Sequence, residues 1–152
     1  MNGAHLHLVL NHFPVILAPT GLVVLALGLF RRNAEFVKVG LGVIFVAALF
    51  TVPTYFSGEG AADKVGDLPG VNMDDIEHHA AVASQAFVVI GLAGIAALAA
   101  LVLGMRGKRP PSWLVVTTLG LSLAASAWLG VTANLGGLIR HPEIRSATAA
   151  EH

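Results

Sequence analysis

Four long apolar segments constrain this chain more than any other feature. They cover residues 6–30, 36–56, 80–103 and 113–139, and apart from Lys38 near the edge of the second they contain no Asp, Glu, Lys or Arg. A helix needs about 20 mostly apolar residues to cross the roughly 30 Å hydrocarbon core of a bilayer, and each segment reaches that length. A transmembrane barrel would need strands of alternating polarity, which these uninterrupted apolar runs lack. The sequence therefore predicts an all-α fold, a bundle of four transmembrane helices forming one membrane domain over 1–152.

The composition excludes the main soluble classes. Hydrophobic residues make up 55% of the chain and charged residues only 12%, whereas a soluble domain carries roughly 25% charged residues. Nine Lys and Arg balance nine Asp and Glu, so no basic surface is available for nucleic acid. The chain has no Cys, which excludes disulfides, thiolate metal sites and covalently attached haem. The lipid bilayer is the predicted partner, and nothing in the sequence predicts an independent catalytic activity.

The distribution of basic residues predicts the orientation in the membrane. Six of the nine lie in the links between segments one and two and between three and four: Arg31, Arg32, Lys38, Arg106, Lys108 and Arg109. By the positive-inside rule these links are cytoplasmic, so both termini and the loop 57–79 are expected outside. No Lys or Arg precedes the first segment, which is therefore expected to be retained as a helix rather than cleaved as a signal peptide. The predicted location is the inner membrane of a bacterium, as a multi-pass protein.

The histidines all fall at the predicted outer end. They are His5, His7, His12, His78, His79, His141 and His152. His12 lies a turn or two inside the first segment, His78 and His79 open the third, and His141 closes the fourth. Ionisable groups inside a membrane bundle are costly and often mark function. The sequence therefore predicts a cofactor site at this end, with His7, His12, His78, His79 and His141 as candidate ligands.

Helical spacing indicates which histidines share a face. His5 and His12 are seven residues apart and fall on one face of a helix. His78 shares a face with Gln85, and a glutamine so far inside the third segment predicts that this face looks into the bundle. His79 lies about 100° away from His78, beside small residues that would leave room for a flat cofactor. The spacing leaves open which of the adjacent pair is a ligand.

The pattern fits three kinds of site. Two facing imidazoles, predicted to be His12 and His79, can bind the iron of haem b from both sides. Three imidazoles and a carboxylate can instead bind a single zinc, copper or iron ion. That metal site would use His12, His79, His141, Glu59 and Glu77. In the third case the histidines simply lie at the membrane interface of a structural subunit.

Four motifs resemble a family of small bacterial four-helix membrane proteins of unknown function. They are HLHLVLNHFPV, PTYFSGEGAADKV, LPGV with IEHHAA, and TANLGGLIRHPEI. The family elements N-H-x-P, G-E-x-A, E-x-H and R-H-P-E correspond to His12 with Pro14, Gly58 with Glu59, Glu77 with His79, and His141 with Glu143. The resemblance covers nearly the whole chain, and the motif over 132–144 is its most specific part. It implies a four-helix fold and a site that uses His79 rather than His78, without implying an activity.

The leading functional prediction is a haem b electron-transfer protein or a subunit of a respiratory complex. A redox partner in the periplasm or the membrane and a homo-oligomeric assembly are compatible with it. The alternatives are a non-haem metal-binding membrane protein that uses the same histidines and a purely structural membrane subunit.

Overall fold

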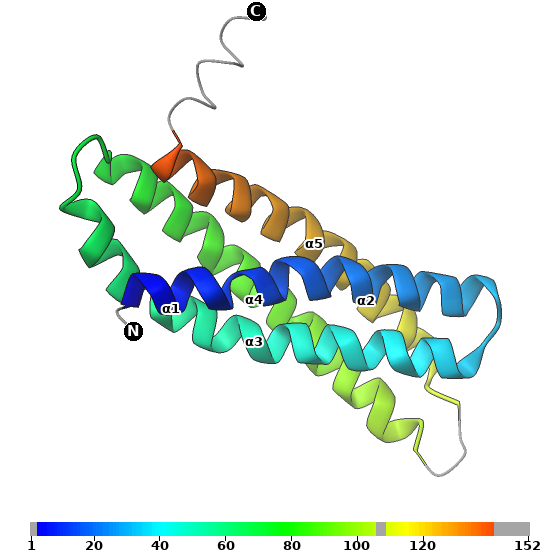
Figure 1. Ribbon diagram of the computed structural model, residues 1–152. Helices are drawn as coiled ribbons and strands as arrows, with labels where there is room; N and C mark the ends of the chain where they lie inside the picture. Colours follow the sequence, from blue (N-terminus) through cyan, green and yellow to red (C-terminus); the bar gives the residue numbers. More distant parts are fainter. Residues whose placement is uncertain (1–2, 106–108, 142–152) are drawn as a thin grey trace, which may run out of the picture.

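The computed structural model describes residues 3–105 and 109–141 and contains five helices in this part of the chain. They are α1 (Gly3–Leu10), α2 (His12–Phe30), α3 (Ala34–Gly66), α4 (Met73–Leu103) and α5 (Ser112–Arg140) (Figure 1). Helices α1 and α2 follow each other as one apolar rod, and this rod, α3, α4 and α5 are each long and apolar enough to cross a membrane. The predicted all-α bundle of four transmembrane helices is confirmed.

The short interruption between α1 and α2 has a local cause. Pro14 has no N–H, and its ring would clash with the carbonyl of Leu10 in a continuous helix. Asn11 nevertheless keeps helical backbone angles, and its N–H donates to the carbonyl of His7 at 2.9 Å. The two helices are therefore separated only slightly and can share one span.

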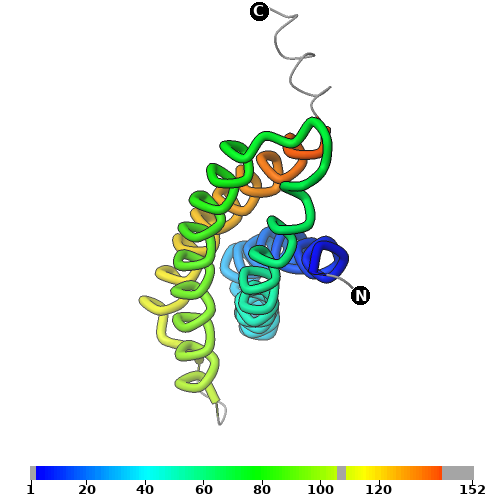
Figure 2. Tube along the Cα trace, turned by 90° about the vertical axis from the view of Figure 1, so that its left-hand side faces the viewer, coloured from blue at the N-terminus to red at the C-terminus, as the bar shows by residue number. Residues whose placement is uncertain are grey.

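The four spans pack as two antiparallel pairs. Helix α2 packs along α3, helix α4 packs along α5, and the pairs meet mainly through α3 with α4 and α2 with α5. Figures 1 and 2 show that the pairs cross at an angle and are joined by the connection between α3 and α4. The core between them contains fully buried Leu25, Leu41, Ile44 and Ile90.

Small residues allow close contact within the α2–α3 pair. A methyl group added at Gly40 would lie 2.5 Å from the backbone nitrogen of Leu25. Such close backbone approach is typical of membrane helices, whose association depends on packing rather than on the hydrophobic effect. The outward surface of the bundle is apolar, with exposed side chains such as Ile16, Val23 and Ile95. This surface matches a lipid environment.

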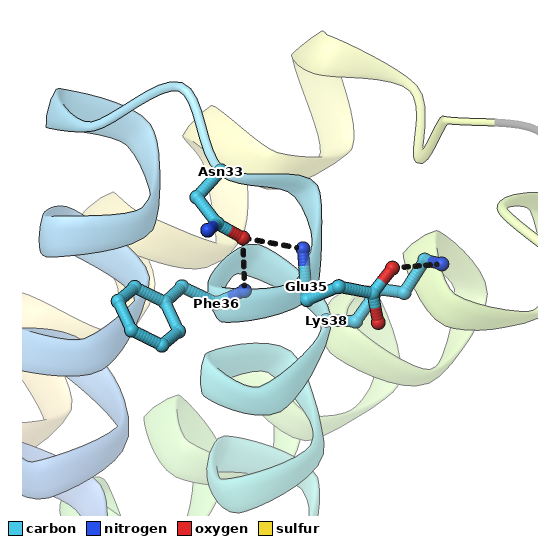
Figure 3. Close-up of polar contacts among 4 residues, drawn as sticks. All are labelled: Asn33, Glu35, Phe36 and Lys38. Atoms are coloured by element: carbon cyan, nitrogen blue, oxygen red, sulfur yellow. Dashed lines mark hydrogen bonds and ion pairs between the residues drawn. The ribbon is translucent and has the colours of Figure 1, made fainter.

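Asn33 caps the start of α3 at one end of the bundle. Its Oδ1 accepts hydrogen bonds from the backbone nitrogens of Glu35 at 2.9 Å and Phe36 at 3.1 Å, and Lys38 forms an ion pair with Glu35 at 3.0 Å (Figure 3). This cap satisfies N–H groups that a helix start leaves unpaired. The end with residues 31–33, 104–105 and 109–111 is called the arginine end below. The opposite end, with His7, the connection 67–72 and His141, is called the histidine end.

The predicted outer loop over 57–79 is mostly helical. Helix α3 continues to Gly66, and α4 already begins at Met73, so the connection covers only residues 67–72. The segment after Phe56 contains no proline before Pro69, and helix formers such as Ala61, Ala62 and Lys64 favour continuation of α3. Asn72 caps α4 by accepting from the backbone nitrogen of Asp74 at 3.0 Å. With 33 residues, α3 is about 50 Å long and exceeds the hydrocarbon core.

Candidate histidine site

His7 bridges the first rod and α3. Its half-buried ring comes from α1, and its Nδ1 lies 3.0 Å from the carbonyl oxygen of Thr54 and 3.1 Å from Oγ of Ser57. Ser57 Oγ itself donates to the Thr54 carbonyl at 2.8 Å. Because a carbonyl oxygen only accepts, these contacts require a proton on Nδ1 of His7. The ring is therefore fixed against α3 in one tautomer.

His79 makes the corresponding bridge in the other helix pair. Its half-buried ring comes from α4, and its Nδ1 lies 3.0 Å from the carbonyl oxygen of Thr132 in α5. The ring also lies against Gly136, where an added methyl group would be 3.1 Å from Cε1 and 3.4 Å from Nδ1. A larger residue at position 136 would displace the imidazole, so the glycine provides the space in which the ring lies.

The His7 and His79 rings lie at the same end of the bundle and have the same hydrogen-bonding pattern. In each, Nδ1–H donates to a backbone carbonyl, so in the neutral imidazole Nε2 carries the lone pair that can bind a metal. Among the described helices, α1 packs mainly on α3. His7 and His79 therefore lie on two different helices, α1 and α4, at the histidine end.

His12 does not face His79 inside the bundle, so this prediction was wrong. The His12 side chain is exposed, and its Nδ1 lies 2.7 Å from the carbonyl oxygen of Leu8 in the same rod. It borders a shallow apolar groove with neighbours such as Phe13 and Ile16. Five residues separate His7 from His12, a rotation of about 140° on a helix. The face that turns His7 toward α3 therefore turns His12 outward.

The face of α4 with His78 and Gln85 also points outward, contrary to the prediction. Both side chains are exposed. Gln85 Oε1 accepts a hydrogen bond from Nε1 of Trp128 at 3.0 Å, which explains how a glutamine is tolerated on this surface. Of the adjacent histidines, His79 is the one that points into the bundle. Its role as a ligand stays a prediction.

The predicted three-histidine metal site is not assembled. His141 lies exposed at the end of α5, and the Glu59 and Glu77 side chains are exposed as well. Within residues 3–105 and 109–141, no group of three His, Asp or Glu side chains could hold a metal ion. Glu143 and His152 lie outside the described residues, as do Arg106, Lys108 and the end of the motif that begins at Thr132.

The residues that hold the two rings were not predicted from the sequence. Thr54, Ser57, Thr132 and Gly136 belong to helices other than those that carry the histidines. The only signal in the sequence was the presence of small and hydroxyl residues at the histidine end of α3 and α5. Comparison of the chain with protein-family profiles, with curated proteins and with solved structures finds no match.

Proposed function

We propose that this chain is a membrane electron-transfer protein that binds haem b at the histidine end, with His7 and His79 as the axial ligands. The observation that carries the proposal is the repeated geometry of the two half-buried rings. Each comes from a different helix pair, and each donates Nδ1–H to a backbone carbonyl of a neighbouring helix. Histidines that bind metals through one ring nitrogen almost always donate the other N–H to such an acceptor.

The residues present fit a haem better than a mononuclear metal. Haem iron needs only two axial ligands from the protein, and cofactors of helix bundles are commonly held between facing helices. Zinc or copper sites usually take three or four protein ligands, and no such group exists among the described residues. Both histidines lie at the histidine end of the bundle, His7 on α1 and His79 on α4. A bound haem would supply one-electron chemistry.

The chain's own residues would orient and protect that group. The Thr54 and Thr132 carbonyls fix the tautomer and the direction of the two imidazoles, and Gly136 keeps α5 clear of the His79 ring. Burial of the rings within a lipid-exposed bundle limits the access of water. This arrangement supports a redox subunit that exchanges electrons with a partner, rather than an enzyme with its own substrate.

The proposal includes an orientation. The described basic residues of the two short links are Arg31, Arg32 and Arg109 at the arginine end, joined by Lys38 in the first turns of α3. By the positive-inside rule this end faces the cytoplasm. The histidine end then faces the outside of a bacterial inner membrane.

Asparagine variants test the ligand assignment and separate it from helix packing. The amide of Asn can donate to the same carbonyl as Nδ1 of histidine but binds haem iron poorly. We expect His7→Asn and His79→Asn to remain folded and to lose the absorption spectrum of six-coordinate haem when the chain is expressed with added haem. The exposed histidines supply matched controls, since His12→Asn and His78→Asn should retain the wild-type spectrum. Retention of that spectrum in either folded variant at position 7 or 79 would contradict the assignment.

A further inference from the structure

A lipid-facing groove crosses α4 near the histidine end. Its volume is about 510 Å³, and its lining includes Tyr55 of α3, Ser84, Gln85, Phe87 and Val88 of α4, and Trp128 of α5. The Tyr55 and Phe87 rings stack with their centroids 4.6 Å apart and form one wall. Trp128 forms the opposite wall. On a helical wheel, Ser84 and Val88 lie between these walls, so the groove has aromatic sides and a narrow floor.

The hydrogen bond of Trp128 fixes the orientation of the Gln85 amide. An indole N–H only donates, so the atom of Gln85 that lies 3.0 Å from it must be the carbonyl oxygen. The NH₂ group of Gln85 is thereby directed away from Trp128 and offers two donors. Ser84 Oγ is already used in a bond to the Ala81 carbonyl at 2.7 Å. The groove therefore presents the Gln85 amide as a hydrogen-bond donor, and Tyr55 adds a phenolic side chain to its lining.

Donors that face lipid favour a ligand that brings acceptors. A polar group in an apolar environment costs free energy unless it is hydrogen-bonded, and acyl chains offer no acceptor. A ligand suited to this groove is a flat ring with carbonyl oxygens and an apolar tail. The ring can pack between the aromatic walls, the carbonyls can accept from Gln85 and Tyr55, and the tail can remain in the bilayer.

We propose that this groove binds the headgroup of an isoprenoid quinone. Gln85 follows His79 by six residues, so the groove lies about 9 Å along α4 from the proposed haem ligand. The inference deepens the proposed function, because the quinone would be the membrane electron carrier that the haem serves. Binding of the quinone itself requires no haem, and it can therefore be tested on the chain without cofactor.

The two tryptophans of the chain allow a site-specific test. Trp113→Phe leaves Trp128 in the groove as the only tryptophan, whereas Trp128→Phe leaves Trp113 at the arginine end. Haem-free protein in nanodiscs is titrated with a ubiquinone analogue that carries a ten-carbon tail, and tryptophan fluorescence is recorded. We expect saturable quenching of Trp128 and only linear, collisional quenching of Trp113.

Substitutions in the Trp113→Phe background identify the donors. Gln85→Leu keeps the side-chain size and removes the amide. It should weaken quinone binding about tenfold, because the loss of one hydrogen bond of about 1.4 kcal/mol changes a dissociation constant by that factor. Tyr55→Phe should weaken it several-fold. Ser126→Ala is the control and should bind as tightly as the parent, because Ser126 lies outside the groove lining and its hydroxyl is bonded to the Ser122 carbonyl within α5 at 2.8 Å.

Three results would overturn the quinone proposal. They are equal linear quenching of both tryptophans, unchanged affinity in Gln85→Leu, and a Trp128 signal reproduced by added phospholipid or by protein concentration alone. The last result would assign the groove to a lipid or to a second copy of the chain. Because the titration uses haem-free protein, its outcome is independent of whether His7 and His79 bind haem.

Discussion

At the scale of single residues, a substitution at Gly136 tests most directly whether α5 confines the His79 ring. An added methyl group at Gly136 meets the His79 ring at 3.1 Å, whereas at Gly137 it meets nothing within 4 Å. The gain in helix propensity from Gly to Ala is the same in both variants. The difference between Gly136→Ala and Gly137→Ala therefore isolates the contact with the imidazole.

We expect Gly136→Ala to be less stable than Gly137→Ala by about 1–3 kcal/mol, the usual cost of overpacking. The measurement is the free energy of unfolding of the purified variants in mixed detergent micelles. Haem affinity should fall in Gly136→Ala alone, since the displaced ring loses its alignment with the Thr132 carbonyl. Equal stabilities and equal haem affinities would show that the ring is not confined by α5.

The sequence predicted the histidine end better than it predicted the individual rings. Spacing placed His78 and Gln85 on one face of α4, because residues that share a helical face are fixed by the helix itself, and both side chains are exposed. It did not show whether each face points inward. That direction depends on the packing of α1 on α3 and of α4 on α5, which no local pattern encodes. The outward position of Gln85 is explained only by Trp128, 43 residues away along the chain.

At the scale of helices, hydropathy located the spans but not the ends of the helices. Each predicted segment lies within α1–α2, α3, α4 or α5. The predicted boundaries near residues 56 and 80 mark where the side chains become polar, whereas backbone helicity continues to Gly66 and resumes at Met73. The cap at Asn72 was predictable, because Asn favours helix starts and acidic residues follow it.

Helices α3 and α4 continue beyond the apolar segments, so the polar residues there are held on helices rather than on a loop. Ser57 lies one turn beyond Pro53, where it can reach both the Thr54 carbonyl and the His7 ring. A flexible loop at this position would not hold the ring in one orientation. The continuation of α3 past the apolar segment is therefore part of how the site is formed.

At the scale of the whole molecule, charge separates the two ends of the bundle. The described acidic residues of the histidine end are Glu59, Asp63, Asp67, Asp74, Asp75 and Glu77, and the only acidic residue described at the arginine end is Glu35. The absence of Cys from the chain makes single introduced cysteines unambiguous reporters of sidedness. In intact cells, a membrane-impermeant thiol reagent should label Asp67→Cys and not Glu35→Cys. Labelling of Glu35→Cys alone would reverse the proposed orientation.

The central claim is that the chain binds one haem between two histidine rings. The most direct test measures the haem content of the purified chain and records the electron paramagnetic resonance spectrum of its oxidised form. Two imidazole nitrogens on one iron produce a low-spin ferric signal. We expect one haem b per chain with that signal, which should be retained in His12→Asn and lost in His79→Asn. Purified chain that takes up no haem when haem is supplied in excess, or haem whose low-spin signal is unchanged by His79→Asn, would contradict the account.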